Sequence, residues 1–243
     1  MLQPKPPASQ VEPQRALMPL DRFVGSLGQR VYQCLRQAIL SLAYGPGEIL
    51  RKPEICEALG VSRSPVSDAV ARLAAEGLVD VVPQAGTFVA RFSMEEIREG
   101  VFLREAIELA AIERVAAIVT DEQLQLLRRN LTVQAALVQG GDIPGFYQSD
   151  AAMHELLLSF TGFRKLAQVS ETAWLHVNRA RQLILPVPGR VEATLAEHRD
   201  IQAALEARDP VAARAAVKLH LGQLLRFLEP LEQERPDLFR PGK

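Results

Sequence analysis

Apolar residues recur at helical spacing along most of the chain, and the first third also holds a break in that rhythm. Between Val66 and Ala74 they fall at every third or fourth position, as on one buried helix face. A shorter apolar segment precedes this one and ends at Gly60, since glycine takes the left-handed cap conformation without steric cost. Two β-rich runs follow, 78–82 and 87–90. The pattern predicts two helices joined by a tight turn, and then a β-hairpin.

After residue 92 the periodicity is helical throughout. Ser93 and Thr120 each stand three residues before a Glu or Gln, which is the spacing of a capping box. Amphipathic helices joined by short loops bury their apolar faces in a common interior. The expected fold is mostly α, an N-terminal winged helix-turn-helix followed by an antiparallel all-α six-helix bundle. The six helices are expected over 93–119, 120–140, 144–160, 163–185, 190–207 and 209–228.

Composition divides the chain into four parts. Residues 1–25 contain five prolines and little apolar periodicity, which is typical of a disordered arm. Residues 26–92 form the expected winged-helix domain, and residues 93–232 the helical domain. Residues 233–243 are expected to be a C-terminal tail.

The overall composition is that of an ordinary globular protein, with 48% hydrophobic and 23% charged residues. No apolar run approaches the roughly 18 residues of a membrane span, and no signal-peptide pattern opens the chain. We therefore expect a cytoplasmic protein with no membrane partner. The net charge of −1 does not by itself indicate a nucleic-acid binder.

The prediction of DNA binding therefore depends on the helix-turn-helix pattern, in which the second helix enters the major groove with its N-terminal residues at base edges. Arg63 opens that helix and is expected to be the main base or phosphate contact. Arg72 either contacts the DNA backbone or is only solvated, and Gly86 lets the wing backbone approach the minor groove. The full set of predicted DNA contacts is Arg51, Lys52, Ser62, Arg63, Ser64, Ser67, Arg72 and Gly86.

A second group of candidate residues lies in the helical part. Asp150 and His154 are four residues apart and so leave the same helix face. His198 and His220 lie among apolar residues on two other helices. A lone histidine on an apolar face is usually a core residue, but three imidazoles and a carboxylate from three helices match a divalent-metal site. Zinc is the first expectation, and nickel, manganese, cobalt or iron accept the same ligands.

Several segments together resemble a known family. The segments Gly45-Pro46-Gly47, Gly60-Val61-Ser62-Arg63-Ser64-Pro65-Val66 and Glu76-Gly77-Leu78-Val79 are similar to the signature of GntR-family bacterial transcription regulators. Residues 93–230 resemble the FCD ligand-binding domain of the FadR subfamily, and six expected helices rather than seven make them similar to the VanR-like branch. The resemblance implies a homodimeric repressor or activator that reads a palindromic operator in double-stranded DNA.

The resemblance also implies a ligand set and an effector. Asp150, His154, His198 and His220 match the family's metal ligands one for one, and the metal there helps to hold a small carboxylic acid. Arg104 either points inward and binds a second acidic group through a bidentate pair, or points outward in a salt bridge. His176 and Asn178 are candidate effector-binding residues, with an ordinary surface position as the alternative for His176.

Two positions depart from the family pattern. Ser67 and Asp68 stand where the family usually has Arg and then Glu, and Gln84 and Ala85 stand where its wing often carries arginine. Loss of positive charge at both places predicts weaker phosphate contacts and a smaller dependence of DNA affinity on salt. It also implies an operator that differs from the family's common half-site.

Three other functions are compatible with the same histidines. A metalloenzyme would use the site to activate water, with Glu155 or Glu197 as a base. Adjacent residues on a helix point about 100° apart, which turns both glutamates away from the metal, and no HExxH motif is present, so we do not expect an enzyme. The remaining alternatives are a regulator that senses the metal itself and a metal that only stabilises the bundle.

Overall fold

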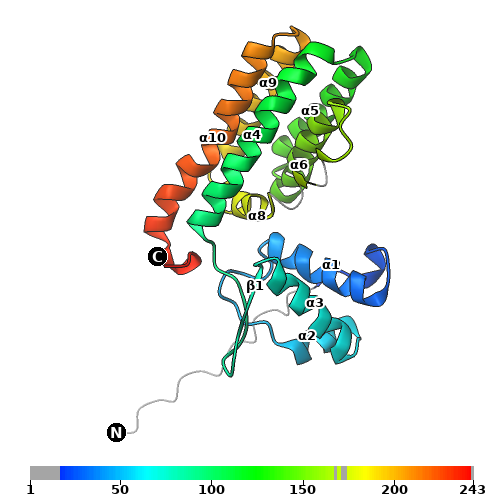
Figure 1. The fold of residues 1–243 in the computed structure, drawn as a ribbon, viewed down its shortest axis with the longest axis vertical. Helices are drawn as coiled ribbons and strands as arrows, with labels where there is room; N and C mark the ends of the chain where they lie inside the picture. Colours follow the sequence, from blue (N-terminus) through cyan, green and yellow to red (C-terminus); the bar gives the residue numbers. More distant parts are fainter. Residues whose placement is uncertain (1–16, 167–168, 171–173, 242–243) are drawn as a thin grey trace. The chain divides into compact units, whose positions relative to one another are not determined.

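The computed structural model describes residues 17–166, 169–170 and 174–241 (Figure 1). Contacts divide the chain into two compact units, Met1–Ala90 and Arg91–Lys243. The described part is mostly helical with one two-stranded sheet, which confirms the predicted fold class. Within these residues no helix is both long enough and apolar enough to cross a membrane.

The first unit is a three-helix core with a β-hairpin. Its elements are α1 (Leu27–Leu40), α2 (Lys52–Leu59), α3 (Arg63–Ala75), β1 (Val79–Val82) and β2 (Gly86–Val89). Helix α3 packs on both α1 and α2, and apolar side chains such as Leu35, Ile55 and Leu73 are fully buried between them. Gly60 has a φ of 63° and caps α2 in the left-handed conformation, as the sequence predicted.

The hairpin pairs Val79 with Val89 and Val82 with Gly86. Gly86 is the first residue of β2, and its φ is 134°. The tip is formed by residues 83–85, where Gln84 has a φ of 62°. Polar Gln84 tolerates this left-handed conformation better than a β-branched residue would, because its side chain is unbranched at Cβ.

The second unit contains the long helices of Figure 1. Helix α10 packs against α4 and α9, and α5 packs against α6 and α9, around buried residues that include Leu127, Phe146, Met153, Ile201 and Val217. Ser93, Thr120 and Asp209 cap three of the helices through their side chains, as expected. The helices are α4 (Met94–Ile118), α5 (Asp121–Gly140), α6 (Ile143–Phe160), α8 (Leu175–Ile184), α9 (Arg190–Glu206) and α10 (Pro210–Glu234).

Two helix boundaries differ from the prediction. The helix expected over 163–185 is not helical at 163–165, since the chain turns at Gly162 (φ 78°) and the Phe163 amide donates to Thr161 Oγ1. Its regular part is α8, and residues 167–168 and 171–173 of the prediction lie outside the described residues. Helix α10 continues past Pro230 to Glu234, because one missing amide donor does not end a helix whose apolar face stays packed.

The chain ends are more ordered than predicted. Residues 1–16 of the expected arm lie outside the described residues, but Leu20–Arg22 form a 3-10 helix and the Cys34 thiol donates to the Met18 carbonyl at 3.3 Å. At the other end, the expected tail contains a second 3-10 helix (Pro236–Leu238) and the buried residue Phe239.

Phe239 joins the C-terminal segment to the start of the helical unit. Its ring lies 5.8 Å from that of Phe92, and the Phe92 amide donates to Leu238 O at 3.0 Å. The Arg240 amide in turn donates to Phe92 O at 2.7 Å, and Arg179 of α8 stacks on the Phe92 ring at 4.5 Å. Phe92, which the sequence placed in the DNA-binding domain, therefore packs within the helical unit.

Replacing Phe239 with alanine is expected to release the C-terminal segment and to cost about 3 kcal/mol of unfolding free energy, typical of a buried Phe truncation. Urea unfolding measures the stability, and hydrogen exchange of the Phe92 and Arg240 amides measures release. Leu126→Ala on α5, where the side chain is 43% exposed, is the control. Unchanged exchange at Phe92 in the Phe239 variant would contradict the prediction.

Candidate functional site

Four predicted ligands meet in the interior of the helical unit. Asp150 and His154 come from α6, His198 from α9 and His220 from α10, and all four are buried. One potential ligand atom of each lies within 4.8 Å of those of the other three. The i, i+4 spacing on α6 supplies two of them, and the packing of three helices supplies the rest.

The distances within this group suit a small cation. His154 Nε2 lies 3.3 Å and His198 Nε2 3.5 Å from Asp150 Oδ1, and His220 Nε2 lies 3.2 Å from His154 Nε2. Tetrahedral ligands about 2.1 Å from a zinc ion are about 3.4 Å from one another. The spacing of the ligand atoms is therefore close to that of a tetrahedral site.

Carboxylates outside the group orient two of the imidazoles. Glu108 of α4 accepts from His154 Nδ1 at 2.7 Å, and Glu197 of α9 accepts from His220 Nδ1 at 2.8 Å. A carboxylate accepts only, so the proton of each ring is at Nδ1 and the lone pair of Nε2 faces the group. Such outer carboxylates accompany most metal-bound histidines and fix both tautomer and ring angle.

A chain of amides orients the third imidazole. Asn130 Nδ2 donates to the Ser149 backbone carbonyl at 2.9 Å, so Asn130 Oδ1 is left to accept from Gln134 Nε2 at 2.7 Å. Gln134 Oε1 then accepts from His198 Nδ1, also at 2.7 Å. The backbone carbonyl thus sets the direction of every bond in the chain, and His198 Nε2 also presents a lone pair.

The three imidazoles are neutral near pH 7. Burial lowers the pKa of His220 to about 4 although Glu197 raises it, and burial lowers the pKa of His154 against the opposing effect of Glu108. For His198, burial and the neighbouring imidazoles hold the pKa well below its usual value. A metal ion needs neutral imidazoles, so the site is already in the protonation state for binding.

The residues present therefore fit a metal cation. Among the described residues, Asp150 Oδ1 and His198 Nε2 are buried and have no hydrogen-bond donor. His154 Nε2 and His220 Nε2 face each other at 3.2 Å with no proton between them when both rings are protonated at Nδ1. Buried unsatisfied acceptors cost about 1–3 kcal/mol each, and a bound cation satisfies all of them.

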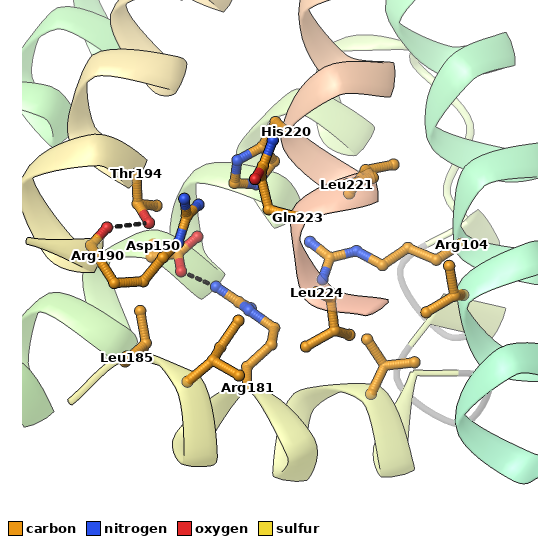
Figure 2. A pocket seen from close by; sticks show the side chains of 13 residues that line it. Arg104, Asp150, Arg181, Leu185, Arg190, Thr194, His220, Leu221, Gln223 and Leu224 are labelled. Carbon is orange, nitrogen blue, oxygen red and sulfur yellow. Dashed lines mark hydrogen bonds and ion pairs between the residues drawn. The ribbon is translucent and has the colours of Figure 1, made fainter. Parts of the chain in front are cut away.

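A pocket lies directly beside this group (Figure 2). Figure 2 shows Arg104 of α4 and Arg181 of α8 reaching toward its centre, with His220 above them and Arg190 of α9 on the opposite side. Arg181 forms an ion pair with Asp150, and its pKa is lowered to about 10 by burial and by Arg104. The other lining residues include Val101, Val177, Ile184, Thr194, Leu221, Gln223 and Leu224.

Of the three predicted effector-binding residues, Arg104 lines the pocket, whereas His176 and Asn178 do not. Arg104 is only 4% exposed and points inward, with Nε donating to Glu108 Oε1 at 2.5 Å, so its salt bridge is buried rather than outward, and its contact with an acid stays a prediction. His176 lies 3.8 Å from Glu96 instead of in the pocket. Asn178 is also outside the lining, and its carbonyl accepts from the Tyr147 hydroxyl at 2.8 Å.

Sequence reasoning missed the partners of the histidines and two of the three pocket arginines. Arg190 donates from both Nη atoms to Glu197, at 2.8 and 2.6 Å, and so completes a chain from arginine to glutamate to His220. One signal was available, because Arg104 and Glu108 interrupt an otherwise apolar stripe at i, i+4 spacing. The residues missed are Glu108, Gln134, Arg181, Arg190 and Glu197.

Replacing Glu108 with glutamine is expected to weaken divalent-metal binding by about 10- to 100-fold, as is usual for an outer partner of a ligating histidine. The amide keeps the size of the side chain but no longer forces the His154 proton onto Nδ1. Calorimetric titration with zinc measures the change. Glu113→Gln, on the exposed side of the same helix, is the control, and an equal effect of both variants would contradict this role of Glu108.

The predicted DNA contacts lie on the first unit. Arg63, Ser64 and Ser67 are exposed on the N-terminal half of α3, and Ser62 is its N-cap. Arg51 precedes α2 and lies 3.7 Å from Glu54. Lys52 begins α2, and Gly86 begins the second strand of the hairpin. The N-terminal end of α3 is therefore exposed and accessible to the major groove of DNA.

Arg72 is separate from this surface. Helical geometry turns residue 72 about 180° from residue 63, and the Arg72 guanidinium stacks 3.7 Å from the centre of the Tyr32 ring. The Tyr32 hydroxyl donates to Glu76, which raises the Tyr32 pKa to about 12 together with the larger effect of burial. Arg72 therefore joins α3 to α1, and its predicted DNA contact stays a prediction.

Comparison with known families finds two matches. Residues 27–89 match the family described as "Bacterial regulatory proteins, gntR family", and residues 99–223 match the "FCD domain". The second range contains all four candidate ligands and both Arg104 and Arg181. The two matched ranges fall in the two structural units.

Similar proteins support both matches. The HTH-type transcriptional repressor RspR of Escherichia coli (strain K12) is 32% identical over 88% of this chain and 93% of its own length. A regulator from Streptomyces ambofaciens is 34% identical over 86% of this chain and 88% of its own length. Among solved structures, E. coli McbR/YncC has a TM-score of 0.73 at 20% identity and covers 86% of this chain and 99% of its own, which supports the fold. A putative GntR regulator from Rhodococcus sp. RHA1 has a TM-score of 0.71 at 25% identity and covers 89% and 100%.

Proposed function

The chain belongs to the GntR family of bacterial transcription regulators and carries an FCD domain, and from this premise we propose that a divalent metal and a small organic acid control its binding to DNA. The winged helix reads operator DNA, and Asp150, His154, His198 and His220 hold the metal. The metal is proposed to be zinc, with nickel, manganese, cobalt or iron as alternatives. The output is proposed to be repression, which is supported by the name of the E. coli relative.

The observation that carries the proposal is the convergence of four buried ligand atoms, the Asp150 carboxylate and three imidazoles whose ring protons all point away from the group. Histidines that only fill space in a core do not need all of their Nε2 lone pairs to face one point. A bound metal would supply a Lewis acid, and an oxygen of the acid would be accepted by expansion of the coordination beyond the four protein ligands. Arg104 lines the same pocket as Asp150 and His220 and suits a carboxylate, because guanidinium and carboxylate form paired hydrogen bonds.

The same helices connect the pocket to the segment that precedes α4. Helix α4 begins directly after residues 91–93 and carries Arg104 and Glu108. Helix α8 carries Arg181 toward the pocket and Arg179 onto the ring of Phe92. An acid that moves Arg104 or Arg181 therefore acts on two helices that both contact the Phe92 segment. We propose this segment as the connection between effector binding and the DNA-reading unit.

A homodimer is proposed to present two winged helices to a palindromic operator. Its support in the structure is apolar exposure on two neighbouring helices, where Phe102 of α4 is 70% exposed and Leu219 of α10 is 58% exposed. Contiguous exposed apolar patches are typical of surfaces that meet a partner, and we propose that these two side chains belong to one such patch. Sedimentation of the wild type and of Phe102→Glu tests the dimer.

The test of the metal and effector is a thermal-shift series on the full chain. Purified protein is measured after chelation, with zinc restored, and with zinc plus each of a panel of small carboxylates. The same series is run on His198→Ala. We expect zinc to raise the melting temperature of the wild type but not that of His198→Ala. We expect one or more acids to raise the melting temperature of the wild type further, and only when zinc is present.

The other outcomes select between the alternatives. Stabilisation by zinc with no response to any acid favours a metal sensor, and DNA binding that follows zinc concentration then identifies it. If zinc stabilises the protein but does not change its DNA binding, the metal only stabilises the helical bundle. Absence of any zinc effect on the wild type contradicts the four-residue site.

A further inference from the structure

The buried charges around the site balance before any ligand is added. Three carboxylates pair with three guanidiniums: Glu108 with Arg104 at 2.5 Å, Glu197 with Arg190 at 2.6 Å, and Asp150 with Arg181. The three imidazoles add no charge, because a histidine that coordinates a metal does so as the neutral ring. The sum over these groups is zero.

A divalent cation in this group leaves two positive charges inside the helical unit. Uncompensated charge is costly in a protein interior, where interactions between charges are screened far less than in water. A bound acid with one negative charge offsets only half of this excess. An acid with two negative charges offsets all of it.

Two arginines are positioned to bind the second acidic group. Glu108 holds Arg104 through Nε, so the two Nη groups of Arg104 extend toward the pocket centre, as Figure 2 shows. Arg181 approaches the same space from α8, and its carboxylate partner Asp150 is also a candidate metal ligand. Arg190 is different, since both of its Nη atoms are already bound to Glu197.

We propose that the effector is a small dianion, one acid group of which lies at the metal while the other lies between Arg104 and Arg181. This inference rests on the proposed function and specifies the class of ligand. A carboxylate supplies the one negative charge that is needed at the second position, whereas a phosphate ester supplies nearly two at pH 7 and so exceeds the balance. The apolar lining residues Val101, Val177 and Leu224 then face the short carbon chain that joins the two groups.

The experiment compares acids that differ in charge and hardly in shape. Zinc-loaded full-length protein is titrated by calorimetry with succinate and glutarate, and with their monoamides succinamate and glutaramate. A second, separate arm compares 2-phosphoglycolate, whose phosphate ester adds a bulky group and nearly two negative charges at pH 7, with glycolate. We expect at least one dianion to bind about 10-fold or more tightly than its singly charged partner. The phosphate arm shows whether a phosphate ester replaces the second carboxylate.

Variants of Arg181 identify the second position. Arg181→Met is expected to reduce the preference for the dianion to less than about threefold, and Arg181→Lys to restore most of it because the charge returns. Zinc affinity is measured separately in each variant, which distinguishes loss of acid binding from loss of the metal. Arg128→Met, which removes the same charge at the surface of the bundle, is the matched control.

Each outcome decides the inference. Equal binding of dianions and monoamides overturns it and leaves the proposed metal and acid response intact. Absence of binding by every acid tested also overturns it. Failure of the wild type to bind zinc removes the proposed function and this inference together. If Arg181→Met does not reduce the preference for dianions, the second acid group does not bind at Arg181. That result overturns its assignment to the space between Arg104 and Arg181.

Discussion

Replacing His198 with alanine is expected to lower affinity for zinc by at least about 100-fold, more than the loss of an outer partner causes. His198 is completely buried, and its Nε2 has no hydrogen-bond donor among the described residues. The substitution removes one of four ligands and leaves Gln134 without its bond to the ring. The Phe146 ring, which stacks on His198 at 6.5 Å, also loses contact.

Competition with a chromophoric chelator measures this affinity on the full chain. His176→Ala is the matched control, because His176 belongs to the same helical unit but lies outside the group of ligands. Circular dichroism without metal verifies that the variant is folded. Wild-type zinc affinity in a folded His198 variant would exclude His198 as a ligand and would leave at most a three-residue site.

The part of the site that sequence predicted follows from local geometry. Asp150 and His154 were paired because residues four apart share a helix face. No local pattern states which faces of α9 and α10 meet that face, so the convergence of His198 and His220 was expected mainly from the family resemblance. The structure confirms the convergence, and the metal itself stays a proposal.

Most of the site residues that the sequence did not predict are charged residues that are buried in the folded protein. Arginine and glutamate in helices are usually exposed, so Arg181, Arg190 and Glu197 gave no sign of facing the interior. Their burial depends on partners far along the chain, such as Asp150 for Arg181. Phe239 was missed for a similar reason, since it and Leu238 are the two large apolar residues of a polar tail and its partner Phe92 is distant in sequence.

DNA recognition is expected to depend most strongly on Arg63, and Arg63→Ala should weaken operator binding by about 1–3 kcal/mol, roughly 5- to 150-fold. Arg63 is the first residue of α3 and is exposed, whereas Arg72 on the same helix is stacked on Tyr32. The neighbouring exposed positions carry serines and Asp68, so no second arginine on this face of α3 replaces the lost charge.

The DNA for this test is a duplex that the wild type selects from a randomised library, and its affinity is measured at several salt concentrations. If Arg63 contacts phosphate, the salt slope falls by about 0.9, and if it contacts a base, discrimination at one position falls while the slope changes little. Arg128→Ala, on the bundle surface beside Glu206, is the control.

Ser67→Arg adds a positive charge to the surface from which Arg63→Ala removes one. It restores charge on the face that contains Arg63, and it is expected to raise affinity for non-specific DNA and to steepen the salt slope by about 0.9. Equal DNA affinities for wild type, Arg63→Ala and Ser67→Arg would mean that α3 does not enter the groove by this face. The two variants thus test the same surface by removing and adding one charge.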